Sequence, residues 1–425
     1  MIPVIAESCR LFQQPSAETV TQNPMATDQN TERQPNCPPQ LAILGTLPPL
    51  RAISHYCEGL VATLVEITHV EFISFAHLYP KKLYPGAALE EDNEPPKHPH
   101  LTIRRELSWF NPLSWVQAGF RVQSPALILQ WWSLPLSPVL LTVAVVARLR
   151  GKRVVTTLHN ITPHSGRSWL YRLATRMILM LSHGAIVHSE RNAEQLTAEL
   201  RQDKDSVWVL PMGAADYRQG RSIEPATSRI RLQLPTDRPI LLMFGALRDY
   251  KGLDVALEAM QSVIESTPKA LLLVAGQPWR AEEHYRNQVR FMGLEQHVRL
   301  DLAFVPDDKI HDYLSAADLL LLPYKHFDAQ SAVGVYALPY GIPLIVSDCG
   351  SLPELVRDPA SVVRPGNAQQ LAARISAVLS SSTLLEQLSA DATELSRRHS
   401  WTSIAQELCR QVDELLSSPQ EEQAG

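Results

Sequence analysis

The chain has 425 residues, of which 45% are hydrophobic and 20% are charged, and its formal net charge is -5. This length exceeds one ordinary core and suits two domains, while the mildly negative charge argues against a dedicated nucleic-acid binder, which normally has a strongly basic domain. The five cysteines form no CxxC pair, so we expect neither a disulfide framework nor a structural zinc site, and a reducing cytoplasm fits best.

The first 38 residues are rich in Gln, Thr, Asn, Pro and Ser and show little periodicity. Such a segment buries too little apolar surface to offset the entropy of ordering, so we predict a disordered tail over residues 1–38. Glu7 follows the short apolar start too closely for a secretory signal peptide. The longest apolar run of the N-terminal half, Val139 to Ala147, is too short to span a bilayer. We therefore expect a protein that is not integral to a membrane.

Short apolar runs alternate with amphipathic stretches in the first half of the chain. The runs predict strands and the stretches predict helices, which together indicate an α/β domain with a parallel sheet over residues 39–215. We expect strands at 41–46, 70–75, 126–131, 153–158, 184–189 and 206–211. We expect helices at 53–65, 112–119, 138–150, 168–181 and 190–200.

A polar segment at 216–227 predicts a hinge, after which the alternation restarts. It indicates a second doubly wound domain over residues 216–400, a helix at 401–417 that packs back across the hinge, and a tail at 418–425. In this half we expect strands at 240–245, 270–276, 298–304, 318–324, 343–348 and 361–365. The predicted fold is α/β, with two Rossmann-like, doubly wound parallel-sheet domains that face a central cleft.

The loop at 244–254 (FGALRDYKGLD) is the strongest local signal, because ligands of open α/β sheets bind beyond the carboxyl ends of the strands. Gly245 ends a predicted strand and lets a ligand come close. Arg248 and Lys251 lie beside the start of a helix, whose amides already favour anions. A diphosphate suits this arrangement, since Arg offers a fork and Lys a point charge. A solvated loop with two surface cations is the alternative, of about equal weight.

A second candidate loop follows the predicted strand at 318–324 and contains Asp328. Ser331 is a suitable N-cap for the next helix, and the amides of Ala332 and Val333 could hold a sugar hydroxyl or a phosphate oxygen. From spacing alone, an ordinary capped helix is the favoured interpretation.

Three further features follow or precede predicted strands. His159 directly follows the strand at 153–158, where it could donate to a sugar hydroxyl or a developing charge, although a lone histidine is more often structural. Glu354 follows a later strand and could do no more than cap a helix. Asp203 and Asp205 have the spacing of a metal-binding DxD motif, but they precede a strand, on the wrong side for the cleft. No metal site is predicted.

Several of these segments, taken in series, resemble family 4 of the retaining glycosyltransferases, which have the GT-B fold. The resemblance spans about residues 41–416 and rests on 47–60, 157–160, 244–254, 272–276, 304–324 and 341–356. It implies transfer of a sugar from a nucleotide-diphosphate donor to an acceptor, with retention and without a metal or another cofactor.

The resemblance also implies roles for single residues. Arg248 and Lys251 would hold the donor diphosphate and stabilise the charge of the leaving group, with Gly245 beneath it. His159 would contact the donor sugar. The start of the helix after the second loop would contact the sugar and the phosphate, through Ser331, Ala332 and Val333.

The chain departs from the family pattern at several positions. The family usually has a pair of glutamates, and the corresponding residues here are Asp328 and Tyr336. Asp328 could keep a sugar-facing catalytic role with a shorter reach. Tyr336 cannot replace a carboxylate that holds ribose hydroxyls. A branch with QSG in this loop also lacks the pair, and the chain resembles that branch with Ala332 in place of the glycine. Arg51 and Ala52 stand where the first loop usually has glycines.

We therefore predict a glycosyltransferase that uses a UDP- or GDP-sugar donor and a glycan or lipid-linked acceptor, in cell-surface polysaccharide or glycolipid biosynthesis. A catalytically silent GT-B binding or scaffold subunit is the alternative. The acceptor is expected in the N-terminal domain, with residues 72–86 as a candidate lining segment.

A basic stretch at 148–176 adjoins an apolar stripe in the predicted helix at 168–181. An ordinary amphipathic core helix is the favoured interpretation of this stripe. A peripheral contact with the inner face of an anionic membrane is the alternative to a purely cytoplasmic location. The stripe consists of Trp169, Leu170, Leu173, Met177 and Leu181.

Overall fold

The computed structural model describes residues 41–50, 53–80, 94–161, 169–200, 202–215, 217–218, 220–327 and 330–418. Several predicted features lie outside these described residues: the tail at 1–38, residues 81–86 of the acceptor segment, Arg51, Ala52, Asp328 and the chain end from residue 419.

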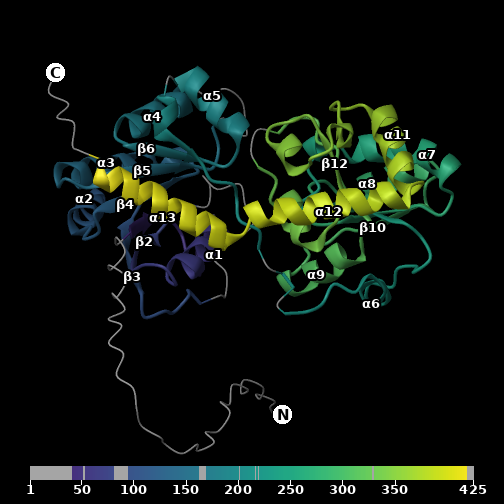
Figure 1. Cartoon of the computed structure of the whole chain (residues 1–425), viewed down its shortest axis with the longest axis horizontal. Coiled ribbons are helices and arrows are strands. Elements are labelled where there is room, and N and C mark those ends of the chain that lie inside the picture. The colour runs from purple at the N-terminus through teal and green to yellow at the C-terminus, as the bar shows by residue number, and fades with distance from the viewer. Residues whose placement is uncertain are drawn as a thin grey trace, which may run out of the picture. The chain divides into compact units, whose positions relative to one another are not determined.

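Seven parallel strands form the sheet of the N-terminal lobe, in the order β3-β2-β1-β4-β5-β6-β7 (Figure 1). The six strands predicted from apolar runs are confirmed, whereas β3 was not predicted. Its sequence, LTIRRELS, carries three charges because this edge strand is largely half-buried. The bounds are β1 Leu41–Leu44, β2 Val70–His77, β3 Leu101–Ser108, β4 Ala126–Trp131, β5 Arg153–Leu158, β6 Gly184–Val187 and β7 Val207–Val209.

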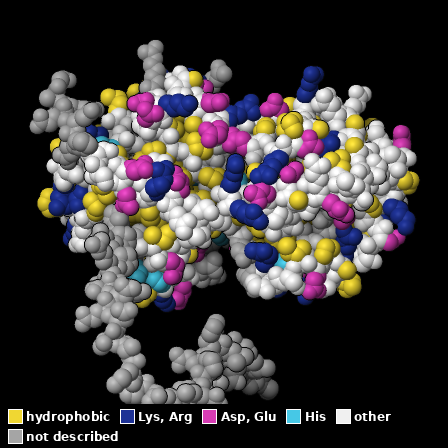
Figure 2. Space-filling view, viewed as in Figure 1, with side chains coloured by type: hydrophobic (Ala, Val, Ile, Leu, Met, Phe, Trp, Pro, Cys, Tyr) yellow, Lys and Arg dark blue, Asp and Glu magenta, His cyan; other side chains and the backbone are white. Residues whose placement is uncertain are grey.

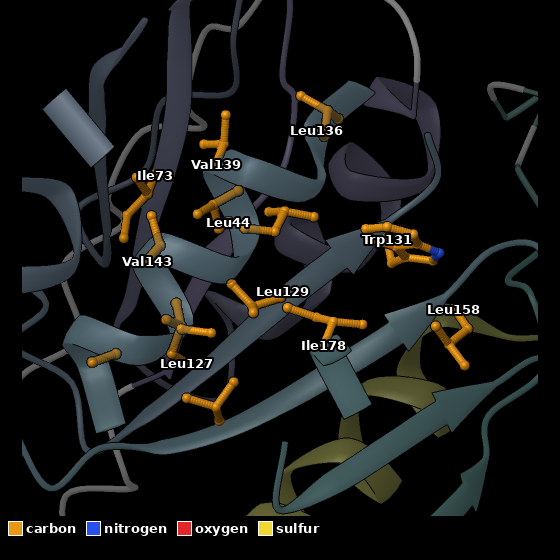
Figure 3. Packing of buried hydrophobic residues seen from close by; sticks show 14 of the residues in the cluster. Leu44, Ile73, Leu127, Leu129, Trp131, Leu136, Val139, Val143, Leu158 and Ile178 are labelled. Carbon is orange, nitrogen blue, oxygen red and sulfur yellow. The ribbon is translucent and has the colours of Figure 1, made fainter. Parts of the chain in front are cut away.

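Helices cover both faces of this sheet, and alternate residues of β1 mark the two sides. Leu44 lies in the core that the sheet forms with α3 and α4, where it is joined by Val143 and Ile178 (Figure 3). Ile43 points to the other face, against α1 and α13. Each such aliphatic side chain contributes roughly 1.5–3 kcal/mol on burial. The helices of this lobe are α1 Ser54–Leu64, α2 Pro112–Arg121, α3 Ser137–Leu149, α4 Trp169–Met180 and α5 Glu190–Leu200.

The apolar stripe of α4 does not face the core, so its favoured interpretation as a core stripe is wrong. Trp169 is 69% exposed, and Leu170, Leu173 and Met177 are exposed as well, whereas Leu181, just beyond the helix, is half-buried. The buried side of the helix is instead formed by Tyr171, Ala174, Thr175, Ile178 and Leu179. Both faces of α4 carry apolar residues, and tertiary packing buries the face with Tyr171 and Ile178 against the core.

Six parallel strands form the sheet of the C-terminal lobe, in the order β10-β9-β8-β11-β12-β13. Counted from β8 this is the doubly wound order 3-2-1-4-5-6, whose ligands bind where the order reverses, here between β8 and β11. The bounds are β8 Ile240–Phe244, β9 Leu271–Ala275, β10 Val298–Asp301, β11 Leu319–Leu322, β12 Leu344–Ser347 and β13 Val362–Val363.

The remaining helices follow or connect these strands. They are α6 Pro225–Arg231, α7 Leu253–Ser266, α8 Glu282–Phe291, α9 Asp307–Ala316, α10 Ala332–Ala337, α11 Ala368–Leu379, α12 Ser382–Arg398 and α13 Trp401–Ser417. The short 3-10 turns are η2 Leu134–Leu136, η3 Lys204–Ser206, η4 Asp249–Lys251, η5 Leu338–Tyr340, η6 Leu352–Leu355 and η7 Pro359–Ser361. Within the described part of the chain, no helix is both long and apolar enough to cross a bilayer.

The last helix, α13, packs against α1 of the N-terminal lobe. Its first residue, Trp401, lies over two glycines: a Cβ at Gly59 or at Gly213 would come within 2.3 Å of the indole ring. Only glycine leaves room for the indole at these two positions, so the end of the chain is anchored to the first lobe.

Candidate functional site

The loops that follow β8 and β11 lie at the point where the strand order of the second sheet reverses. The two strands are parallel neighbours, with Leu319 paired to Leu241 and Leu320 to Leu242. Their carboxyl ends therefore bring the two predicted loops to the same edge of the sheet.

Three predicted binding residues meet at this edge. Gly245 has a φ of 92°, in the region that favours glycine. A Cβ built on it would lie 2.9 Å from Nζ of Lys251 and 3.3 Å from Cγ2 of Val333. The structure thus brings Gly245, Lys251 and Val333 together, and the ammonium group approaches residue 245 so closely that only glycine fits there.

Lys251 is the buried cation of the site. Its side chain is only 8% exposed, and Nζ donates a hydrogen bond to the carbonyl of Phe244 at 3.1 Å and lies 5.8 Å from the ring centre of Tyr324. Burial, together with the nearby charge of Arg248, lowers the pKa of Lys251 to about 8. No carboxylate of the described residues forms an ion pair with it, so an added anion would find an uncompensated charge.

Arg248 lies beside Lys251 but has a different environment. Its guanidinium group stacks over the indole of Trp279, 4.5 Å from the ring centroid. The two cations line the same pocket, of about 220 Å³. The neighbouring carboxylate of Asp249 does not pair with either of them, because it is bound by Arg280. Positive charge therefore predominates where Arg248 and Lys251 meet.

Ser331 caps α10, as its sequence position predicts. Its side chain is buried, and Oγ accepts a hydrogen bond from the amide of Gly334 at 3.4 Å. The first helical bond runs from the amide of Val335 to the carbonyl of Ser331. The amides of Ala332 and Val333 precede that bond, as the first amides of a helix do.

Tyr336, which stands where the sequence resemblance leads one to expect a second glutamate, forms part of an aromatic pair. Its ring contacts that of Tyr217 edge-on, with centroids 5.2 Å apart. Burial raises the pKa of Tyr336, so it stays a neutral phenol. Nearby, Oε1 of Gln330 accepts a hydrogen bond from the amide of Met212 at 2.6 Å, which ties the loop after β11 to the segment after β7.

His159 is held at both ring nitrogens by protein groups. Nε2 lies 2.8 Å from Oε1 of Gln130, and Nδ1 lies 3.2 Å from Nε2 of His188, while the ring of Tyr56 contacts the imidazole edge-on. Burial lowers the pKa of His159 well below its usual range, so the imidazole is neutral.

The hydrogen-bond partners of His188 and His159 determine which ring nitrogen of each histidine carries the proton. Nδ1 of His188 lies 2.9 Å from the carbonyl of Leu210, so it must carry the proton and leave Nε2 as an acceptor. Nδ1 of His159 then donates to His188, which leaves Nε2 of His159 as an acceptor. The side-chain amide of Gln130 must therefore be turned over, so that its nitrogen and not Oε1 faces this ring. Sequence reasoning missed Gln130 and His188, although each is a polar residue at the carboxyl end of an apolar strand.

Glu354 caps a helix, but the helix belongs to the other lobe. Its carboxylate accepts hydrogen bonds from the amides of Glu190 and Arg191, both at 3.1 Å, at the start of α5. The guanidinium of Arg191 in turn donates to Asp348 and to the carbonyl of Gly350, each at 3.0 Å. The loops after β12 and the start of α5 thus form one hydrogen-bonded connection.

Replacing Glu354 with alanine should lower the free energy of unfolding by about 1 kcal/mol, since two amides of α5 lose their cap and the helix dipole loses its carboxylate. Denaturant titration of the two proteins measures the difference. The exposed Glu295, replaced in the same way, should change stability by less than about 0.5 kcal/mol. Equal values for the two variants would contradict the assigned cap.

The DxD-like letters lie before β7, as expected from the sequence. Oδ1 of Asp203 accepts from the amide of Asp205 at 3.3 Å and so caps the short turn η3. Among the residues that the structure describes, no group of three or more His, Cys, Asp or Glu side chains could hold a metal ion.

Comparisons with known proteins place these features in a family context. Residues 226–395 match the family model "Glycosyl transferases group 1". A putative teichuronic acid biosynthesis glycosyltransferase of Bacillus subtilis, TuaC, is 27% identical over 303 residues, which cover 65% of this chain and 72% of the relative. A GDP-mannose:glycolipid 4-beta-D-mannosyltransferase of Xanthomonas campestris is 31% identical over 181 residues, which cover 42% of this chain and 45% of that protein.

The fold is similar to that of solved structures over most of the chain. Anabaena Alr3699/HepE, crystallised with UDP, superposes with a TM-score of 0.67 at 17% identity, covering 88% of this chain and 100% of that one. For several further relatives, D-inositol 3-phosphate glycosyltransferases, the chain spans about half of their length. The group 1 match covers most of the second lobe, and the chain as a whole has the fold of GT-B glycosyltransferases, so these likenesses support an enzyme that transfers sugars.

Proposed function

We propose that the chain transfers a sugar, with retention, from a UDP- or GDP-sugar to a glycan or lipid-linked acceptor. The observation that carries the donor assignment is the buried ammonium of Lys251, which lies beside Gly245, lines the same pocket as Arg248 and has no carboxylate partner among the described residues. A diphosphate would supply the missing negative charge.

In this proposal the site stabilises the charge that develops on the leaving nucleotide. Lys251 and Arg248 supply two cations, and the first amides of α10 supply dipoles that are already oriented. These groups need no reorganisation when the sugar–phosphate bond breaks. Because cations of the chain itself would neutralise the diphosphate, we propose that transfer needs neither a metal ion nor another cofactor.

The proposed acceptor follows from the relatives. The Bacillus protein is named for teichuronic acid biosynthesis and the Xanthomonas protein for a glycolipid acceptor. By analogy with these two names, we propose a glycan or glycolipid acceptor here, in polysaccharide or glycolipid biosynthesis. A lipid-linked acceptor would require the enzyme to work at a membrane surface.

A panel of nucleotides tests the donor proposal. We expect either UDP or GDP to raise the unfolding temperature of the full chain, because a ligand at about 100 times its Kd adds roughly 2.7 kcal/mol to the native state. The corresponding nucleoside should give little shift, since it lacks the diphosphate. The measurement is differential scanning fluorimetry without added metal. A folded protein whose melting temperature is unchanged by every nucleoside diphosphate would refute the proposal.

A catalytically silent subunit is the second candidate function. The aromatic pair of Tyr336 and Tyr217 favours it, because a phenol stands where the family holds the ribose with a carboxylate. The same panel separates the two functions: a silent scaffold without a donor site gives no shift, whereas an enzyme gives a shift and releases nucleotide from its donor sugar.

A further inference from the structure

One stretch of the chain is free of acidic residues. Residues 107–189 contain no Asp and no Glu, although the whole chain has 44 acidic residues and a net charge of -5. The same stretch contains eight cationic residues: Arg121, Arg148, Arg150, Lys152, Arg153, Arg167, Arg172 and Arg176. A local excess of this size gives part of the N-terminal lobe a positive potential that the overall composition conceals.

The helices of this stretch also turn large apolar side chains toward solvent. On α2, Leu113 is 71% and Phe120 is 63% exposed, and on α4 Met180 is 80% exposed. Sixteen large hydrophobic residues of the described chain are exposed, and eleven of them lie between residues 110 and 180, so they are concentrated. The eleven are Phe110, Leu113, Val116, Phe120, Val145, Leu149, Trp169, Leu170, Leu173, Met177 and Met180.

These residues belong to adjacent helices. The helix α3 packs against both α2 and α4, which places their outer sides next to one another. Figure 2 shows hydrophobic side chains beside Lys and Arg side chains at the left edge of the molecule, where Figure 1 labels α2 and α3. We call the outer sides of α2, α3 and α4 the α2–α4 face.

Cations lie among the apolar residues of this face. The guanidinium of Arg150 stacks over the ring of Phe120 at 4.7 Å, and Arg148 donates to the carbonyl of Leu181 at 3.1 Å, which fixes both at the ends of helices. On α4, Arg172 lies 3.7 Å from Glu199 of α5, and both side chains remain about half exposed. At the end of α2, Arg121 lies 3.0 Å from Glu106 of β3. The two carboxylates therefore offset two of these cations and leave an excess of positive charge.

We propose that the α2–α4 face binds peripherally to a bilayer that contains anionic lipids. The exposed aromatic and aliphatic side chains enter the interface between headgroups and acyl chains, and the arginines contact lipid phosphates. Charge complementarity selects this occupant, since a face on which cations outnumber carboxylates, beside exposed Trp and Phe side chains, suits an anionic surface that is apolar beneath. The inference rests on the proposed lipid-linked acceptor and names the surface that would bring the enzyme to it.

Vesicle co-sedimentation of the full chain, without donor, tests the proposal. We expect binding to vesicles of equal parts phosphatidylcholine and phosphatidylglycerol, weaker binding at about 0.5 M salt, and little binding to phosphatidylcholine alone. Replacing Trp169 and Met180 together with serine should lower the partition coefficient at least about tenfold. Both side chains are exposed, so the melting temperature should stay unchanged.

A matched double variant on the other lobe is the control. Phe291 is 92% and Phe304 is 61% exposed, and replacing both with serine should leave vesicle binding unchanged. Equal losses in the two double variants, absence of binding to anionic vesicles, or binding to RNA in place of vesicles would each overturn the proposal. A Lys251→Met protein should still bind vesicles, and the stabilisation by nucleotides is measured without vesicles. Failure of the membrane-binding proposal is therefore distinguishable from failure of the proposed donor site.

Discussion

Replacing Lys251 with methionine should abolish sugar transfer while making the nucleotide-free protein more stable. In the proposed mechanism the variant loses a charge that stabilises the leaving diphosphate, which corresponds to a decrease in kcat/KM of about a thousandfold or more. Enzyme turnover with the donor identified in the nucleotide panel measures this effect. Lys269 is exposed and paired with Asp237 across 2.9 Å, so a Lys269→Met variant is the matched control and should keep normal turnover.

The gain in stability follows from the lowered pKa. The unfolded chain keeps its lysine protonated up to about pH 10.4, whereas the folded protein loses the proton near pH 8. The folded state therefore carries an unfavourable buried charge at pH 7, and this cost disappears as the pH rises through 8 towards 10. We expect Lys251→Met to raise the free energy of unfolding at pH 7 by roughly 2 kcal/mol, and to give little gain at pH 10.

The same protonation makes donor binding depend on pH. In the proposed donor site the diphosphate binds the ammonium form of Lys251, so the Kd for the nucleotide should rise as the pH of the solution passes about 8. Isothermal titration between neutral and alkaline pH measures this change. A Lys251→Met protein that bound the nucleotide with unchanged affinity would show that the diphosphate lies elsewhere.

Replacing Gly252 with alanine should be the most destabilising single change near the site. Gly252 has a φ of 73°, and a Cβ there would lie 2.0 Å from the carbonyl oxygen of Pro323. The loops after β8 and β11 would have to separate, because a backbone atom cannot rotate away as a side chain can. We expect a loss of roughly 3–5 kcal/mol in the free energy of unfolding, together with weaker nucleotide binding.

Gly293 provides the matched control, because it has a φ of 67° and nothing within 4 Å of an added Cβ. A Gly293→Ala variant therefore shows the cost of left-handed backbone alone, about 1 kcal/mol. Denaturant titration of both variants separates the two terms. If the two alanine variants were equally stable, the close approach of the loops would not hold the site together.

The sequence predicted most of the fold for a clear physical reason. Parallel strands that are buried on both faces read as continuous apolar runs, and the runs that became β8 and β11 placed the loops with Lys251 and Ser331 at one sheet edge. Edge strand β3 was missed because only part of it is buried, so its charged residues interrupt the run.

Contacts between distant segments could not be predicted in this way. The carboxylate of Glu354 caps α5, which lies more than a hundred and fifty residues earlier in the chain. His159 is oriented by Gln130 and His188, which come from two other strands of its sheet. Local patterning carries no information about which polar groups become neighbours after folding.

By itself, the sequence determined two doubly wound α/β lobes and a pair of cations at a strand end, because periodicity and loop chemistry are local properties of the chain. The tertiary structure alone decided that Lys251 is buried and that the stripe with Trp169 faces solvent. Burial depends on which surfaces meet, and α4 has apolar residues on both sides, so only packing against the sheet could select the side with Ile178 for the core.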